Sequence, residues 1–268
     1  MGITAIFGAG VMGETLLSGL LRAGRRPDDL VITERNPDRG RLLSEKYGVR
    51  VLSNTEAAED AETLVLVVKP QDMAALLDEI RDHVHPGNTV VSLAAGITTE
   101  FLESRLPEGS SVVRVMPNTP ALVDQGMSGI APGRHCTDDH LAEAESLLSS
   151  CGKVARLEEK HLDAVTAISG SGPAYIFYVV EAMIEAGVVL GLPRATSTEL
   201  VVQTLYGAAT MLRETGEHPT VLREQVSSPG GTTVAALRQL DDHKVRAAFV
   251  NAIEAAAARS KQLASGQV

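Results

Sequence analysis

A glycine-rich turn near the start of the chain, Gly8-Ala9-Gly10-Val11-Met12-Gly13, constrains the fold more than any other feature. It directly follows a short apolar segment, Ile3–Phe7, that is typical of a buried strand. Leucines then recur with helical spacing at positions 16, 17, 20 and 21. A lone GxGxxG pattern is weak evidence, because glycine turns also arise by accident. Between a strand and a helix, however, it predicts a turn that binds the pyrophosphate of a dinucleotide.

Each glycine of this turn has an expected task. Gly8 permits the tight turn, Gly10 lets the pyrophosphate approach the backbone, and Gly13 lets the helix pack closely on the strand. The pyrophosphate is then expected at the N-terminus of the helix, where backbone N–H groups point outward.

The end of the second predicted strand is expected to contact the cofactor ribose. The strand is Leu30–Thr33, and Glu34-Arg35-Asn36 follows it. An acidic side chain at this place accepts a hydrogen bond from a free 2′-hydroxyl, whereas a nearby arginine accommodates a 2′-phosphate. Both residue types are present, so the residues alone leave NAD and NADP open. A solvated strand end explains Glu34 and Arg35 equally well.

Apolar segments alternate with helical ones through the first half of the chain. This alternation predicts an α/β fold with a parallel, doubly wound sheet of the Rossmann type. In such sheets the ligand lies beyond the carboxyl ends of the strands, which here are followed by Lys69–Gln71, Ala94–Gly96 and Pro117–Pro120. Lys69 is alternatively a surface lysine before a turn. The further predicted strands are Val49–Leu52, Thr63–Val68, Asn88–Leu93 and Val112–Met116.

From about residue 160 the strand pattern stops and long helices are predicted. They run from Pro173 to about Gly191, from Thr196 to Arg213 and from Lys244 to Leu263. Alanine and glycine occur on several of their faces, and a helix that is apolar all round must be buried. We therefore predict two domains, residues 1–158 for the dinucleotide and residues 159–268 as an all-α dimerisation and substrate domain. The helical part is too small to bury its own apolar faces, which predicts an obligate homodimer.

Composition argues against several other classes of protein. A net charge of −10 disfavours a nucleic-acid or anionic-membrane surface. No continuous apolar run approaches the ~20 residues that span a bilayer, and the N-terminus runs directly into a strand. The expected location is therefore the cytoplasm, without a membrane or nucleic-acid partner. Cys136, Cys151 and the seven histidines lack the spacing of metal ligands, so no metal is expected.

A second unusual segment, Ser227-Ser228-Pro229-Gly230-Gly231-Thr232-Thr233, interrupts the helical half. Paired glycines let a backbone approach a ligand closely, and the N-terminus of the helix that follows favours a carboxylate or a phosphate. A capped turn between two helices is the simpler interpretation of this segment alone.

Taken together, these motifs resemble those of the pyrroline-5-carboxylate reductases. Six matching pieces occur in order over nearly the whole chain, and the last two are particular to this family. The pieces are Phe7–Gly13, Val68-Lys69-Pro70-Gln71, Ser92–Gly96, Val115–Ala121, Ser169–Tyr175 and Ser227–Thr233.

The resemblance implies a function. Members of this family reduce 1-pyrroline-5-carboxylate, a cyclic imine, to L-proline in the last step of proline biosynthesis. NADPH is the implied cofactor, with NADH also possible. The family has a Rossmann domain followed by a helical dimerisation domain, with the active site at a cleft between two subunits. Its dimers often assemble into larger rings.

The resemblance also assigns residues of the substrate loop. In the family, backbone amides of the loop hold the substrate carboxylate, which here implies Ser228, Gly230, Gly231 and Thr232. The second threonine, Thr233, is implied as the catalytic residue that hydrogen-bonds the ring nitrogen.

The cofactor contacts are implied in the same way. Val68, Lys69, Pro70 and Gln71 match a segment beside the nicotinamide. Arg35 and Asn36 match positions that commonly hold the 2′-phosphate, although Glu34 precedes them. Gly13 stands where many members have alanine, and either residue is expected to fit. The remaining cofactor contacts are Gly8, Ala9, Gly10, Val11, Met12, Asn54, Ala94, Ala95 and Gly96.

The residues around the substrate loop agree with this chemistry. A protonated C=N bond is already electrophilic, so its reduction requires alignment more than a strong acid. A ketone would require a proton donor, and the sequence near the loop offers no obvious one.

Two alternatives remain open from the residues. A β-hydroxyacid or phosphogluconate-type dehydrogenase shares the layout, but those enzymes place a catalytic lysine in the helical half. This chain has no lysine between Lys160 and Lys244. A nucleotide-sensing binding protein without turnover is the other alternative, and it has no need of the Gly230–Thr233 loop.

Overall fold

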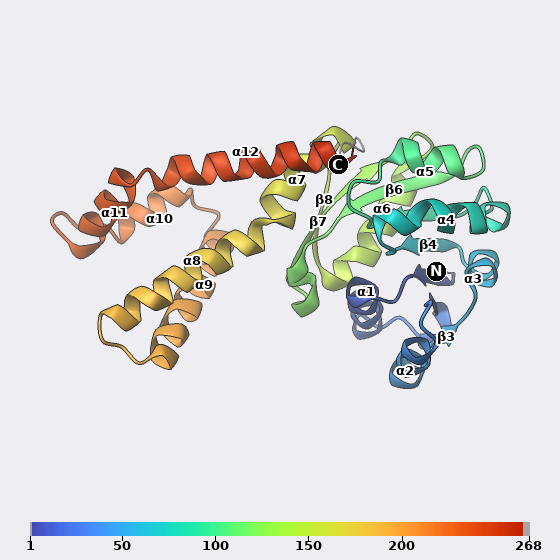
Figure 1. Ribbon diagram of the computed structural model, residues 1–268, viewed down its shortest axis with the longest axis horizontal. Coiled ribbons are helices and arrows are strands. Elements are labelled where there is room, and N and C mark those ends of the chain that lie inside the picture. Colours follow the sequence, from blue (N-terminus) through green and yellow to red (C-terminus); the bar gives the residue numbers. More distant parts are fainter. Residues whose placement is uncertain (1, 265–268) are drawn as a thin grey trace. The chain divides into compact units, whose positions relative to one another are not determined.

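The computed structural model describes residues 2–264, and the chain divides into two compact units (Figure 1). Within the described residues, the first unit contains residues 2–171 together with residues 256–264. The second contains Gly172–Ala255. The domain boundary predicted after residue 158 therefore lies inside the first unit, and that division stays a prediction.

A mixed sheet forms the centre of the first unit. Within the described residues it has eight strands in the order β3-β2-β1-β4-β5-β6-β7-β8. β1 to β6 are all parallel to one another, which confirms the predicted doubly wound sheet. β7 pairs with β6 in the antiparallel sense. The strands are β1 Thr4–Phe7, β2 Leu30–Thr33, β3 Arg50–Val51, β4 Thr63–Leu66, β5 Thr89–Ser92, β6 Ser111–Met116, β7 Gly126–Pro132 and β8 Gly152–Arg156.

The last two strands were not predicted. β7 contains two glycines and a proline, so its sequence lacks the apolar pattern of a strand. β8 is short and only partly buried. β7 pairs with β6 and β8 pairs with β7, and a local pattern does not reveal such neighbours.

Helices cover both faces of the sheet, because successive residues of a parallel strand point to opposite faces. In β1, Ile6 packs into one apolar cluster with α1, α2 and α6, whereas Ala5 and Phe7 pack into the other with α3, α4 and α5. Each fully buried leucine in these clusters contributes about 1.5–3 kcal/mol. The helices are α1 Val11–Arg22, α2 Pro37–Tyr47, α3 Asn54–Asp60, α4 Pro70–Ile80, α5 Thr99–Arg105, α6 Asp138–Leu148 and α7 Leu162–Val165.

Short helical turns complete the first unit. Five are 3₁₀ turns and one, η6, is a π-helical turn. They are η1 Pro27–Asp29, η2 Arg81–His83, η3 Thr119–Val123, η4 Ser149–Cys151, η5 Glu159–His161 and η6 Thr166–Gly170.

The second unit is helical, as predicted. Its helices are α8 Gly172–Val189, α9 Arg194–Thr215, α10 Pro219–Gln225, α11 Thr232–Asp242 and most of α12, Val245–Ala264. α8 and α9 lie side by side (Figure 1). The Ser197 hydroxyl donates to the Ile184 carbonyl at 2.9 Å, and a Cβ at Gly187 would lie 2.1 Å from that hydroxyl. Small residues therefore permit this close approach.

The apolar side chains of the second unit are mostly exposed in the single chain. Between Gly172 and Ala255 only Ser197 and Val201 are buried. Phe177 is 67% exposed, Tyr178 77% and Tyr206 67%. Apolar surface on this scale marks an interaction site.

One helical stretch of the described residues, Glu159–Val189, is long and apolar enough to cross a membrane, with a mean hydropathy of 1.3. None of its apolar window is buried. No continuous apolar run marks this stretch in the sequence, because glycines, serines and a few charges interrupt its apolar residues. Length and composition alone do not distinguish a lipid-facing helix from one that a second chain covers.

Candidate active site

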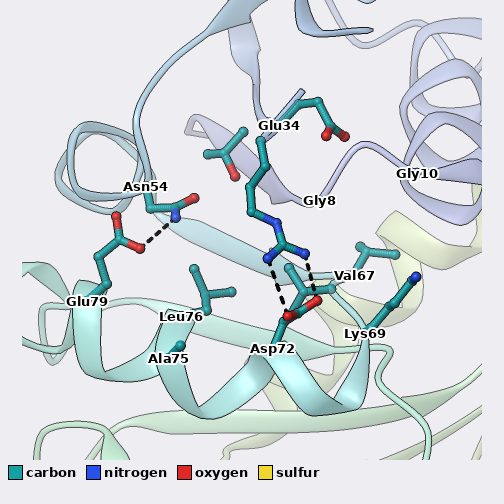
Figure 2. A pocket seen from close by; sticks show the side chains of 13 residues that line it. Gly8, Gly10, Glu34, Asn54, Val67, Lys69, Asp72, Ala75, Leu76 and Glu79 are labelled. Atoms are coloured by element: carbon teal, nitrogen blue, oxygen red, sulfur yellow. Dashed lines mark hydrogen bonds and ion pairs between the residues drawn. The ribbon is translucent and has the colours of Figure 1, made fainter. Parts of the chain in front are cut away.

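A cavity of about 270 Å³ lies at the carboxyl ends of β1, β2 and β4 (Figure 2). It gathers seven of the residues that the sequence singled out for the cofactor: Gly8, Gly10, Glu34, Arg35, Asn54, Val68 and Lys69. The cavity therefore lies where ligands bind in sheets of this topology.

The glycine turn has the geometry that a pyrophosphate requires. Gly8 has φ +94°, a conformation that L side chains rarely adopt, and its N–H donates to the Thr33 carbonyl at 3.1 Å. A Cβ at Gly10 would meet no atom within 4 Å, so the backbone is open to a ligand there. Gly10 is also the N-cap of α1 and provides no side-chain cap, which leaves N–H groups of the first turn for an anion. These residues fit a dinucleotide.

Gly13 is more restricted than the sequence analysis expected. A Cβ at this position would lie 2.2 Å from the Gly8 carbonyl oxygen, which is a backbone atom. The expectation that alanine fits equally well is wrong for this backbone, because the turn would have to move.

An ionic cluster beneath the turn holds it in place. The Arg39 guanidinium donates to the Ala9 carbonyl at 2.7 Å and to the Glu14 carboxylate at 2.9 Å. Lys46 and the Tyr47 hydroxyl also donate to Glu14, at 2.8 and 2.9 Å. The hydrogen bond from Lys46 is the main reason that the pKa of Glu14 lies below its ordinary value. Sequence reasoning missed this cluster, whose members are far apart in the chain.

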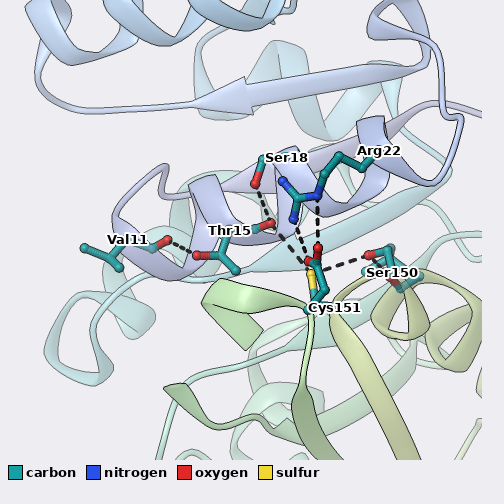
Figure 3. Close-up of polar contacts among 8 residues, drawn as sticks. Val11, Thr15, Ser18, Arg22, Ser150 and Cys151 are labelled. Atoms are coloured by element: carbon teal, nitrogen blue, oxygen red, sulfur yellow. Dashed lines mark hydrogen bonds and ion pairs between the residues drawn. The ribbon is translucent and has the colours of Figure 1, made fainter. Parts of the chain in front are cut away.

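The other end of α1 is also fixed (Figure 3). Arg22 donates to both carboxylate oxygens of Asp124, at 2.5 and 3.1 Å. The Cys151 thiol packs against the Thr15 carbonyl at 3.6 Å, and a Cβ at Gly19 would lie 2.5 Å from its sulfur. Burial raises the pKa of the Cys151 thiol, as befits a packing residue. These contacts position the helix whose N-terminus faces the cavity.

The residues after β2 that were predicted to contact the cofactor ribose, Glu34, Arg35 and Asn36, interact with each other and with α4. The Glu34 carboxylate accepts the Asn36 N–H at 3.0 Å. Asn36 caps α2 by accepting from the N–H groups of Asp38 and Arg39, and it does not line the cavity. Arg35 donates to both oxygens of Asp72, at 2.7 and 3.3 Å. The arginine expected to hold a 2′-phosphate is therefore paired with an acid.

Asn54 and Lys69 lie on two other elements around the cavity (Figure 2). The Asn54 amide donates to Glu79 at 2.8 Å. Lys69 precedes α4 as its N-cap residue and, within residues 2–264, forms no ion pair. Its charge is therefore available at the mouth of the site.

Several lining residues were missed by the sequence analysis, and most lie on one face of α4. Asp72, Ala75, Leu76 and Glu79 have the spacing i, i+3, i+4 and i+7, which places them on the same side of a helix. That spacing was the available signal. Thr33 and Val67 complete the lining.

The remaining residues predicted for the cofactor do not line this cavity. Ala94 is buried and Ala95 is exposed. Pro70 begins α4, and Gly96 has φ +76°. The full set outside the lining is Ala9, Val11, Met12, Gly13, Asn36, Pro70, Gln71, Ala94, Ala95 and Gly96.

Two of the other sequence motifs meet elsewhere in the first unit. The Asn118 amide donates to the Ser169 carbonyl at 3.2 Å and approaches its hydroxyl at 3.1 Å. Ser169 lies in the π-helical turn η6, and such turns are frequent at functional sites. The sequence analysis assigned no role to either residue.

The predicted substrate loop lies in the second unit, between α10 and α11. Gly230 has φ +71°, and the Gly231 N–H donates to the Ser228 carbonyl at 2.9 Å, which closes a tight turn. Gly231 is the N-cap of α11 and provides no side-chain cap. Thr232 and Thr233 are the first two residues of the helix, so neither side chain caps it. The interpretation of this segment as a capped turn is therefore not supported by its geometry.

The first turn of α11 is therefore open to an anion. The N–H groups at the start of a helix have no partner within the helix. Across residues 2–264, the hydroxyls of Ser228, Thr232 and Thr233 form no hydrogen bond. Ser228 and Thr232 are exposed and Thr233 is half-buried. Backbone donors and hydroxyls are thus gathered within one short segment.

The fold and these two sites define an NAD(P)-dependent oxidoreductase with a helical domain for self-association. Residues 3–96 match the family model described as NADP oxidoreductase, coenzyme F420-dependent. Residues 159–263 match the model described as pyrroline-5-carboxylate reductase dimerisation. The exposed apolar helices therefore belong to a domain that associates with itself, and this match includes Glu159–Val189.

Individual relatives identify the family. The chain is 47% identical over 263 residues to the pyrroline-5-carboxylate reductase of Corynebacterium melassecola, covering 97% of each chain. It is 44% identical to that of Mycobacterium tuberculosis strain H37Rv, covering 97% of this chain and 96% of the relative. The chain belongs to the pyrroline-5-carboxylate reductase family, which confirms the resemblance drawn from the six motifs.

Solved structures agree with this assignment. A pyrroline-5-carboxylate reductase from Coxiella burnetii superposes with a TM-score of 0.94 at 36% identity, covering 98% of each chain. The Plasmodium falciparum pyrroline carboxylate reductase, solved with NADP bound, gives a TM-score of 0.87 at 29% identity, again covering 98% of each chain. The predicted fold class is confirmed.

Proposed function

We infer that the protein reduces 1-pyrroline-5-carboxylate to L-proline with NAD(P)H, the last step of proline biosynthesis. The observation that carries this inference is the 47% identity to a pyrroline-5-carboxylate reductase over 97% of both chains. Both candidate sites fall within that match.

The cofactor site is the cavity at the ends of β1, β2 and β4. A bound nicotinamide cofactor supplies the hydride. The turn at Gly8 and Gly10 holds the pyrophosphate on the N-terminus of α1, and Lys69 contributes positive charge at the mouth of the cavity. Glu34 and Arg35 lie at the ribose end. We expect NADPH to be preferred, with Arg35 holding the 2′-phosphate, and NADH to be accepted.

The substrate site is the loop Ser228–Thr233. Ser228, Gly230, Gly231 and Thr232 hold the substrate carboxylate through backbone N–H groups at the start of α11, where the helix dipole also favours a negative charge. The Thr233 hydroxyl hydrogen-bonds the ring nitrogen and orients the imine. A protonated imine needs no stronger acid from the protein, because it is already electrophilic.

We propose that the self-associating domain makes an obligate dimer and that dimers assemble into a ring. The exposed apolar faces of α8 and α9 support this proposal. Sedimentation of the dilute protein tests it, since a folded monomer at low concentration would contradict an obligate dimer. The cytoplasmic location expected from the sequence stays a prediction.

The direct test of the function is the loss of NADPH absorbance when pyrroline-5-carboxylate is added, with proline identified as the product. Omission of the substrate gives the background rate. Binding of NADPH without turnover would contradict the proposal and favour the nucleotide-sensing alternative.

A further inference from the structure

The ion pair between Arg35 and Asp72 has no place in the function described so far. Both residues line the cofactor cavity, and the guanidinium contacts the two carboxylate oxygens at 2.7 and 3.3 Å (Figure 2). This arrangement is bidentate, and it occupies two of the in-plane N–H groups with which arginine binds either a carboxylate or a phosphate.

The two partners differ in how firmly the fold holds them. Asp72 is the third residue of α4, its N–H donates to the Lys69 carbonyl at 2.9 Å, and its side chain is 27% exposed. A carboxylate in the first turn is also stabilised by the helix dipole. The Arg35 side chain is 78% exposed. Opening of the pair therefore moves the arginine and leaves the acid in place.

The charge of the cavity makes this pair important for cofactor choice. Three acids, Glu34, Asp72 and Glu79, and two bases, Arg35 and Lys69, line it. Glu79 is occupied by the Asn54 amide. A ribose 2′-phosphate brings close to two further negative charges, so it needs a cation that Asp72 already holds. A ribose 2′-hydroxyl brings none and can donate a hydrogen bond to the Glu34 carboxylate.

We propose that Asp72 sets the preference between NADPH and NADH, because it competes with the 2′-phosphate for the Arg35 guanidinium. NADPH binds by displacing this internal carboxylate, whereas NADH leaves the ion pair intact. Asp72 is thus a specificity-determining residue that acts through Arg35. The inference depends on the proposed use of both cofactors.

The test compares two ligand fragments that differ only by the phosphate, adenosine 2′,5′-bisphosphate and 5′-AMP. Their affinities for the full-length protein are measured by calorimetry in low salt. Asp72→Asn is expected to tighten bisphosphate binding about fivefold, the upper range for an exposed ion pair, and to tighten 5′-AMP binding much less, because 5′-AMP gains only from lost repulsion. In steady-state assays the KM for NADPH should fall relative to that for NADH.

A matched control lies on the same helix. Asp78 pairs with Arg105 at 2.9 and 3.2 Å, and it does not line the cavity. Asp78→Asn therefore removes one acid and one ion pair from α4 without touching the site. It should change neither fragment affinity, which separates competition at Arg35 from a general change in charge.

A second variant tests whether the change in bisphosphate affinity depends on Arg35. Arg35→Ala should weaken bisphosphate binding. When Asp72→Asn is added to Arg35→Ala, the affinity should rise only by the small amount that comes from removing the repulsion between the Asp72 carboxylate and the phosphates. An unchanged or lower bisphosphate affinity in Asp72→Asn would overturn the proposal, because the acid would then orient the arginine for the phosphate. In that case both fragments still bind and the proposed function stands. If neither fragment binds the unaltered protein, the cofactor assignment itself fails.

Discussion

The two units of this chain bury their apolar residues to very different degrees. In the first, Ile6, Phe7 and Leu64 are completely buried between sheet and helices. In the second, aromatic residues such as Phe177 and Tyr206 are two-thirds exposed. The first unit therefore contains its own core, whereas the second exposes apolar side chains on a domain that associates with itself. Because their burial differs, the two units should respond differently to mutation.

The largest effect is expected from a cavity in the first unit. Leu64→Ala in β4 removes a fully buried side chain and should lower the free energy of unfolding by about 2–5 kcal/mol. Denaturant unfolding measures this loss. The loss should be the same at high and low protein concentration, and a strong dependence on concentration would show that the first unit is not self-sufficient.

The second unit should show the opposite dependence. Tyr178 on α8 is 77% exposed in the single chain, so Tyr178→Glu breaks no internal packing. A charge introduced into an apolar self-association surface should nevertheless weaken association at least tenfold, about 1.4 kcal/mol. Sedimentation over a dilution series gives the dissociation constant. Val51→Glu, at an apolar residue that is 38% exposed on the edge strand of the first unit, is the control. Unchanged association of Tyr178→Glu would remove α8 from the interface.

A mutation in one candidate site should leave the function of the other site nearly unchanged. Thr233→Ala should lower kcat/KM for the imine about 10- to 100-fold, because it removes the proposed hydrogen bond to the ring nitrogen that aligns the substrate. NADPH binding, which belongs to the first unit, should stay nearly intact. Steady-state kinetics and calorimetry measure the two quantities, and Thr232→Ala, which keeps its backbone N–H, serves as the comparison. An unchanged kcat/KM in Thr233→Ala would contradict its assignment.

The smallest effect concerns pH and the first unit alone. Burial raises the pKa of Glu159, but hydrogen bonds from Thr99 and Arg114 outweigh burial and bring that pKa below its ordinary value. A carboxyl whose pKa is lower in the folded state contributes stability above its unfolded pKa, about 4.3, and loses it as the pH falls through the folded pKa.

Glu159→Gln should therefore cost stability at neutral pH and flatten the acid limb of the unfolding curve below about pH 4.5. Unfolding measured across that range provides the test. The neighbouring Glu158 forms an ion pair with Lys160 in which both side chains are exposed, and solvent screens such a pair. Glu158→Gln should therefore change the acid limb much less than Glu159→Gln does. If the two variants behave alike, the buried pair with Arg114 contributes nothing specific.

The sequence predicted the parts of the fold that depend on local pattern. The glycine turn, the strand Leu30–Thr33 and the three long helices α8, α9 and α12 follow from spacing and from turn residues, and all are present, whereas α10 was not predicted. β7 and β8 were missed because β7 depends on pairing with β6, and β8 depends on pairing with β7, rather than on a pattern of their own. The residues of α4 that line the cavity had a helical signal that was not used.

Contacts over long range mark the limit of sequence reasoning for the site. Arg35 and Asp72 are 37 residues apart, so their pairing depends on how β2 and α4 pack rather than on any motif. The same holds for Arg39, which reaches the Ala9 carbonyl from α2. Residue types at the site were predictable, whereas their partners were not.

The uncapped starts of α1 and α11 have a consequence for folding as well as for binding. In each helix a glycine stands at the N-cap and provides no side-chain acceptor. A bound anion supplies the acceptor that serine or aspartate provides in other helices. In the proposed binding mode, each ligand completes the first turn of its helix, and it should add about 2.7 kcal/mol of stability at a hundredfold excess over its Kd. Amide hydrogen exchange in these two first turns should consequently slow with pyrophosphate ligands for α1 and with proline for α11, each independently of the other.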